Sequence, residues 1–267
     1  MTRFRLLLMI VAAALAAGAG LGGFWLNSGR LPWQSARGAG LKAISPEAAR
    51  RDVEAVLKAA PDYAPYLLAL NAAFPNDYAR LVAKFASRRA LAGGSESADL
   101  YVTDAVSSLS QTRGTMAARA AAPALEAIFA VQAKIAGALA ASDARLCVDF
   151  IYGATSQGYF DFAAKNRALI AEMAQTGLAA IVSGQGVKIA RGAPSDADLN
   201  QFEAALSKNG LSRAEIEAFM DSKSPEPPIP DAKLCAAGRT YFNVLKGLDE
   251  AVRLRMYGRA VELMAKS

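Results

Sequence analysis

Apolar residues return every three or four positions through most of the chain after residue 44. In the stretch from 98 to 110, Leu100, Ala105, Val106 and Leu109 follow this spacing. Such spacing places apolar side chains on one face of a helix, whereas a half-buried strand alternates apolar and polar residues. The sequence has no alternating run of useful length. The pattern therefore predicts an all-α protein in which residues 45–267 fold as a multi-helix bundle.

Local sequence marks several helix starts in this region. Ser45, Pro46 and Glu47 supply a capping hydroxyl, a first-turn proline and an acid near the positive helix end. Pro123 either begins another helix or kinks the preceding one, because proline is poorly tolerated inside a helix. We expect the helix that follows Pro123 to bury one face made of Leu125, Ile128, Gln132, Ile135 and Leu139.

Further along, residues 195–220 predict a short helical hairpin. Ser195-x-x-Asp198 and Ser212-x-x-Glu215 are capping-box patterns that start its two helices, and Asn209-Gly210 forms the turn between those helices. The proline-rich residues 225–230 predict an extended connection. The two longest helices are expected to run without interruption, from Tyr159 to Val182 with Gly184 and Gly186 as its end, and from Asp231 to Ala265.

The beginning of the chain has a different pattern. Residues 6–26 form a run of 21 without a charge, which at about 1.5 Å per residue spans the roughly 30 Å hydrocarbon core of a membrane. Arg3 and Arg5 precede the run, and Phe24 and Trp25 close it. The sequence predicts a cytosolic segment 1–5, a transmembrane anchor 6–26, a flexible linker 27–44 and an exported domain 45–267.

Two alternatives compete with a simple anchor at this segment. Ala17-Gly18-Ala19 is an acceptable signal-cleavage site, so the domain is secreted if the chain is cut near Ala19. Gly18, Gly20 and Gly23 match the spacing of a dinucleotide-binding loop. That loop needs a strand before it, a helix after it and a downstream acid, and this segment offers none of them.

An uncleaved anchor places the domain on the periplasmic side of a bacterial-type inner membrane. Ala14, Gly18 and Gly22 form a row of small residues, which is either a homodimer face where two membrane helices approach closely or the ordinary small-residue composition of such anchors. Two later apolar stretches contain charges, Glu126 and Lys134 in one and Glu172 in the other. Because charges are costly within a span, we expect both stretches to be buried bundle helices.

Composition narrows the classes of function. The chain is 53% hydrophobic and 20% charged, with a net charge of +6. The sequence shows no concentrated basic face, so it gives no indication of nucleic-acid binding. It has no histidine, which removes the commonest general base and most zinc and haem sites. An EF-hand-like start at Asp196 lacks glycine at the sixth position and glutamate at the twelfth. We therefore expect no metal and no cofactor.

The two cysteines stand in matching surroundings. Cys147 follows Asp-Ala-Arg-Leu and Cys235 follows Asp-Ala-Lys-Leu, each in the first turns of a predicted helix. Two such cysteines in an exported chain predict a disulfide that ties the last helix to the middle of the bundle. The alternative is a reactive thiol, but the chain has neither a C-x-x-C motif nor a histidine to activate one.

Two clusters are candidate binding sites. Tyr152, Tyr159, Phe160 and Phe162 surround a glycine-containing loop, which is either a small-ligand pocket or an aromatic corner of the core. Arg253, Arg255 and Arg259 lie beside Glu250 and Glu262 in the last helix. They form either a salt-bridged surface or a patch for an anionic ligand or lipid.

Three functional hypotheses follow. The first is a membrane-tethered envelope protein whose helical domain binds or scaffolds a protein partner, which predicts an exposed apolar or mixed-charge groove and no pocket of converging polar groups. The second is a small-ligand or sensory domain with a cavity near residues 152–162. The third is a histidine-free enzyme acting on cell-wall material, which needs two carboxylates facing one cleft.

Overall fold

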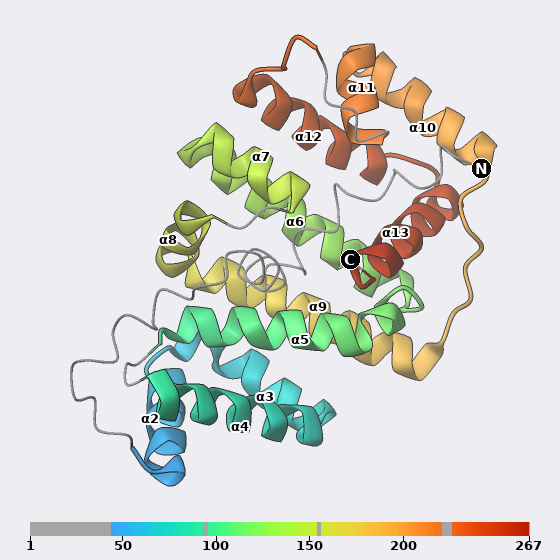
Figure 1. Ribbon diagram of the computed structural model, residues 1–267. Helices are drawn as coiled ribbons and strands as arrows, with labels where there is room; N and C mark the ends of the chain where they lie inside the picture. The colour runs from blue at the N-terminus through green and yellow to red at the C-terminus, as the bar shows by residue number, and fades with distance from the viewer. Residues whose placement is uncertain (1–43, 93–95, 154–155, 221–225, 267) are drawn as a thin grey trace.

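The computed structural model describes residues 44–92, 96–153, 156–220 and 226–266 (Figure 1). Across these ranges the chain forms helices and no strand, which confirms the predicted all-α bundle. In chain order the helices are α2 (Pro46–Lys58), the short 3-10 helix η4 (Pro61–Tyr63), α3 (Ala64–Ala73), α4 (Pro75–Ala92), α5 (Ala98–Ala117), α6 (Ala122–Ser142), α7 (Ala144–Tyr152), α8 (Gln157–Lys165), α9 (Arg167–Val187), α10 (Asp196–Lys208), α11 (Arg213–Met220), α12 (Asp231–Lys246) and α13 (Glu250–Met264).

Several predictions for the first 43 residues lie outside the described residues. These are the anchor at 6–26, the cleavage site near Ala19, and the dimer face of Ala14, Gly18 and Gly22. They stay predictions from the sequence.

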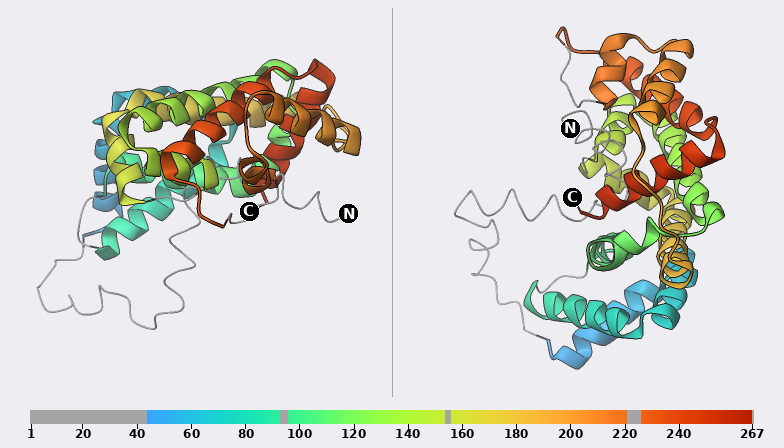
Figure 2. Two further views of the ribbon diagram at one scale, coloured as in Figure 1. Left: turned by 90° about the horizontal axis from the view of Figure 1, so that it is seen from above. Right: turned by 90° about the vertical axis from the view of Figure 1, so that its right-hand side faces the viewer.

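The helices α5 and α9 lie side by side through the middle of the molecule (Figures 1 and 2). On one side of this pair, η4 and α3 pack against α9, and α2 and α3 pack against α4. On the other side, α6 packs against α9 and contacts α7, α12 and α13, while the α10–α11 hairpin leans on α12. The C-terminal ends of α5 and α9 meet, and α13 passes beside them, with Gly258 close to Ala118 and Arg191.

The helix starts predicted from local sequence are confirmed. The hydroxyl of Ser45 accepts a hydrogen bond from the Ala48 amide at 3.2 Å. Ser195 and Asp198 form the complete capping box, with each side chain accepting from the other residue's amide. In the turn between α10 and α11, Gly210 has φ of 88°, a conformation that side-chain-bearing residues rarely adopt.

The predicted helix from 159 to 182 is interrupted. The chain breaks at Asn166, whose backbone leaves helical geometry and whose side-chain amide donates to the Phe162 carbonyl at 2.8 Å. The next residue, Arg167, reaches across to a carboxylate of α5, Asp99. The break is thus fixed by a tertiary contact, which apolar spacing does not encode.

The predicted final helix is also interrupted, between Lys246 and Glu250. At this bend Leu248 turns into the core. The Arg253 guanidinium donates to the Leu248 carbonyl at 2.8 Å and so holds the bend. Gly247 ends α12 and Asp249 precedes α13, so the sequence does carry a local stop and start signal that the predicted continuous helix overlooked.

Gly184 and Gly186 lie inside α9, which ends at Val187 with Lys188 in the left-handed conformation (φ 52°). The prediction that these glycines end the helix is therefore wrong. Gly184 has a packing role, because a Cβ there would lie 1.8 Å from the carbonyl oxygen of Met116. Only glycine allows α9 to come this close to the end of α5.

Helix α6 is the one helix among the described residues that is long and apolar enough to cross a membrane, with mean hydropathy 1.5. In this structure it contacts α7, α9, α12 and α13. The whole predicted face, Leu125, Ile128, Gln132, Ile135 and Leu139, is buried. The prediction of a core helix over this stretch is confirmed.

Candidate functional site

The two cysteines form the predicted disulfide. Cys147 of α7 and Cys235 of α12 are bonded, with their Cα atoms 5.7 Å apart and 88 positions between them in sequence. Each lies near the start of its helix. The bond therefore holds α7 against α12 across the segment that contains α8 to α11.

The aromatic residues around the α7–α8 loop pack together. Tyr159 and Phe162 are buried, while Tyr152 and Phe160 are partly buried. The ring of Tyr152 stacks on Phe219 of α11, with centroids 5.9 Å apart. Burial raises the pKa of Tyr159 to about 12. These contacts belong to the core, and a ligand pocket at this corner stays a prediction.

Buried carboxylates are matched by basic or hydroxyl groups. Asp99 accepts two hydrogen bonds of 2.8 Å from Arg167 and one of 2.8 Å from the Tyr63 hydroxyl. Asp198 accepts two from Arg255, at 2.9 and 2.7 Å. The arginine hydrogen bonds lower the pKa of both acids, that of Asp198 to about 2. Both carboxylates are therefore ionised partners in structural contacts.

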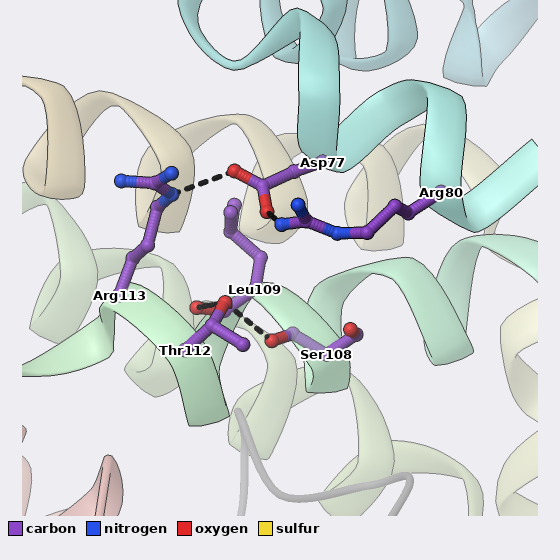
Figure 3. Close-up of polar contacts among 6 residues, drawn as sticks. All are labelled: Asp77, Arg80, Ser108, Leu109, Thr112 and Arg113. Atoms are coloured by element: carbon purple, nitrogen blue, oxygen red, sulfur yellow. Dashed lines mark hydrogen bonds and ion pairs between the residues drawn. The ribbon is translucent and has the colours of Figure 1, made fainter.

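A third buried acid, Asp77, joins α4 to α5. Figure 3 shows its carboxylate between Arg113 of α5, at 2.7 Å, and Arg80 of its own helix. The Arg113 guanidinium also lies 4.3 Å from the ring centroid of Phe74, a cation–π contact. Asp77 is thus a tie between two helices.

Each of the three arginines singled out on the last helix contacts a carboxylate. Arg253 contacts Glu126 at 2.8 Å and Arg255 contacts Asp198. Arg259 contacts Glu262 at 2.8 Å. The salt-bridged interpretation is therefore correct for all three arginines, and Arg259 also lines the hollow described next.

The main candidate site is a hollow of about 620 Å³ at the ends of α5, α9 and α13. We call it the basic groove, because its charged lining consists of five cationic side chains and one carboxylate: Arg119, Lys188, Arg191, Arg259, Lys266 and Glu262. The small residues Gly192, Ala193 and Gly258 complete much of its wall. Its volume is in the range of ordinary ligand sites.

Backbone contacts give the basic groove its shape. The Ile189 amide donates to the Arg119 carbonyl at 3.0 Å, which joins the segment after α9 to the end of α5. The Arg191 guanidinium donates to the Ala118 carbonyl at 3.3 Å. Gly258 lies beside this contact, where a Cβ would be 3.2 Å from the same carbonyl. The absence of a side chain at this position leaves room for Arg191 to lie across α13.

Within the basic groove, the single carboxylate is already engaged. Glu262 lies 2.5 Å from Lys266 and 2.8 Å from Arg259, and the hydrogen bond from Lys266 lowers its pKa. Arg119 and Lys188 have no carboxylate partner among the described residues. Burial lowers the pKa of Arg191, so its cation is poorly solvated there. A bound anion would compensate that loss of solvation.

The ends of three helices offset only part of this charge. Each helix C-terminus carries about half a negative charge, so three contribute roughly −1.5. The five cations and one carboxylate sum to a charge of +4. Because the effect of a helix end is confined to its last turn, the basic groove keeps an excess of positive charge, which favours an anionic ligand.

A second hollow, of about 530 Å³, lies between α10 and α11. Its charged lining residues are Glu203 and Arg213, and Arg213 contacts Glu217 at 2.8 Å. It has no excess of either charge, so it gives less indication of a ligand. No group of three potential metal-ligating side chains occurs in the part of the chain that the structure describes.

Sequence reasoning singled out one residue of the basic groove, Arg259, and missed the other cations. The missed residues come from three segments that are distant in sequence: Arg119, Lys188 and Arg191, and Lys266. The one sequence feature that these cations share is that each lies within a few residues after the end of a helix. Comparison of the chain with protein-family models, curated proteins and solved structures finds no match, so the site is defined by its geometry.

Proposed function

We propose that this chain is a membrane-tethered envelope protein whose exported helical domain is a binding module, with the basic groove as its binding site for an acidic partner. The observation that carries the proposal is the excess of cations over carboxylates in the groove. The predicted anchor at 6–26 supplies the tether. The disulfide suits an oxidising compartment outside the cytosol.

The buried acids support binding rather than carboxylate catalysis. A glycosidase needs two carboxylates on either side of one substrate bond. In this domain Asp77, Asp99 and Asp198 each contact an arginine, and the basic groove has one carboxylate. A cation-rich groove without a second acid fits recognition of negative charge.

The test uses the full chain in non-ionic detergent and a fluorescent peptide of ten glutamates. We expect binding at low salt that weakens as salt screens the charges. The variant Arg119→Gln/Lys188→Gln should bind at least about tenfold more weakly. The matched control, Lys58→Gln/Lys84→Gln, removes two exposed lysines from α2 and α4 and should bind like the parent chain. Equal binding by all three proteins would refute the groove as the site.

The tether is tested separately. The intact mass of the protein recovered from membranes distinguishes an uncleaved anchor from a chain cut near Ala19. A reporter fused after Ser267 shows which side of the membrane the domain occupies. Membrane protein of the cleaved mass would remove the anchor from the proposal and leave the groove.

A further inference from the structure

Beside the basic groove, the domain exposes aliphatic side chains. The large hydrophobic residues that are well exposed in the described residues include Val182, Val187 and Ile189, at 42%, 53% and 40% of their surface. These three lie within eight positions of one another, whereas Leu68 and Leu91 lie on other helices. We call residues 182–191 the α9 tip. Within it Val187 and Ile189 flank Lys188, and Arg191 follows two residues after Ile189.

Contacts on the inner side hold the α9 tip in place. The Ser183 hydroxyl accepts from the Ala121 amide at 3.0 Å, and Gly184 lies directly against Met116. The Lys188 amide donates to the Gly184 carbonyl at 3.2 Å. Because these contacts fix the backbone, Val187 and Ile189 keep their exposed positions instead of folding back onto α5.

Exposed aliphatic residues next to a cationic groove match the chemistry of an anionic membrane surface. Aliphatic side chains gain by entering the region between headgroups and acyl chains. Lysine and arginine are attracted to anionic headgroups, and each contributes about fivefold to binding. An acidic protein segment would use the cations but would leave the aliphatic residues without a defined role.

From this combination we propose that the α9 tip and the basic groove together dock the domain on an anionic phospholipid surface, with headgroup phosphates held by Arg119, Lys188 and Arg191. This inference rests on the proposed function and names its acidic partner. The predicted linker 27–44 has 18 residues, which reach up to roughly 60 Å when extended. A domain tethered in this way stays within reach of the same membrane.

The experiment compares hydrogen exchange of the full chain with two kinds of lipid nanodisc. One disc contains phosphatidylcholine alone, and the other contains phosphatidylcholine and phosphatidylglycerol at seven to three. We expect the peptide covering residues 185–193 to exchange at least about threefold more slowly with the anionic disc. The comparison holds whether the chain is inserted in the disc or free beside it.

Two variants and two controls separate charge from aliphatic contact. Arg119→Gln/Lys188→Gln should lose the protection, and Val187→Thr/Ile189→Thr should reduce it. Lys58→Gln/Lys84→Gln removes equal charge elsewhere, and Leu91→Thr removes an aliphatic residue that is 86% exposed. Both control variants should keep the slower exchange of residues 185–193 with the anionic disc. Unchanged exchange in the helices α5 and α6 confirms that each variant is folded.

Equal exchange of residues 185–193 with both discs would overturn the lipid proposal. If the glutamate peptide still binds the groove in that case, the proposed function stands and the partner is an acidic protein. If neither probe binds, both proposals fail. Protection that survives the removal of Arg119 and Lys188 would also overturn the assignment of the phosphate site.

Discussion

At Asp99 a buried carboxylate is met by Arg167 and the Tyr63 hydroxyl, whereas in the basic groove cations from three helix ends face one carboxylate, Glu262. The first site holds α5, η4 and α9 together with charges that balance. The second keeps an excess of positive charge. Charged side chains that are paired within the chain stabilise the fold, and cations in excess of the nearby carboxylates can bind a partner.

The largest effect should come from the disulfide. In the chain-entropy model, opening a loop of 88 residues costs about 4–5 kcal/mol of unfolding free energy. Urea unfolding with and without reductant measures this loss. The variant Cys147→Ser/Cys235→Ser should be insensitive to reductant, and any reductant effect on it would point to another cause. The glutamate peptide should still bind the folded variant, because neither cysteine lines the groove.

The second largest effect is expected at the Asp99–Arg167 pair. Arg167→Met leaves Asp99 buried without its main partner, which should lower the unfolding free energy by about 2–4 kcal/mol, since Arg167 is itself partly exposed. The comparison is Arg119→Gln in the groove, which should change stability by less than about 0.5 kcal/mol. Thermal and urea unfolding of both variants provide the measurement. Equal losses at the two positions would remove the distinction between structural and unbalanced charge.

A smaller effect is expected where α9 meets α5. Gly184→Ala places a methyl group against the Met116 carbonyl and should cost about 1–3 kcal/mol. It should also weaken peptide binding, because Lys188 follows directly after this turn of helix. Gly186→Ala has open space around it and should gain up to about 1 kcal/mol. Two alanine variants of equal stability would show that the close approach is not required.

The smallest effect concerns pH. The folded-state pKa of Asp198 is lowered to about 2 by its hydrogen bonds with Arg255, so its contribution to stability is complete above the unfolded pKa of about 3.9. That contribution is lost as the pH falls from about 4 toward 2. Arg255→Gln should flatten this part of the stability curve, measured by urea unfolding at several pH values. An unchanged slope would mean that other acids determine it.

Much of the fold was predictable because its signals are local. A capping hydroxyl such as Ser195 acts on amides two or three residues away, and the buried face of α6 repeats within one helix. The bend at Leu248 was missed although Gly247 and Asp249 mark it locally. The break at Asn166 was missed because Arg167 fixes it through a contact with Asp99, which is distant in sequence. Local propensity carries no record of such partners.

The candidate site was harder to predict for the same reason. Arg119 and Lys266 are separated by most of the domain in sequence, and only the folded chain brings them to one groove. The sequence did indicate the disulfide, because two cysteines allow one pairing. With many charged residues, the sequence does not show which ones lack a partner.

The apolar composition of α6 affects translocation of the unfolded chain as well as the folded structure. A segment this apolar forms the core once the domain has folded, but the proposed export must carry it across the membrane unfolded. Glu126 lies near its start and Lys134 near its centre, where a charge costs about 2.5–3.5 kcal/mol during insertion. These two side chains thus favour complete passage over arrest in the bilayer. Replacing both with leucine would leave a segment that the translocation machinery retains as a second anchor.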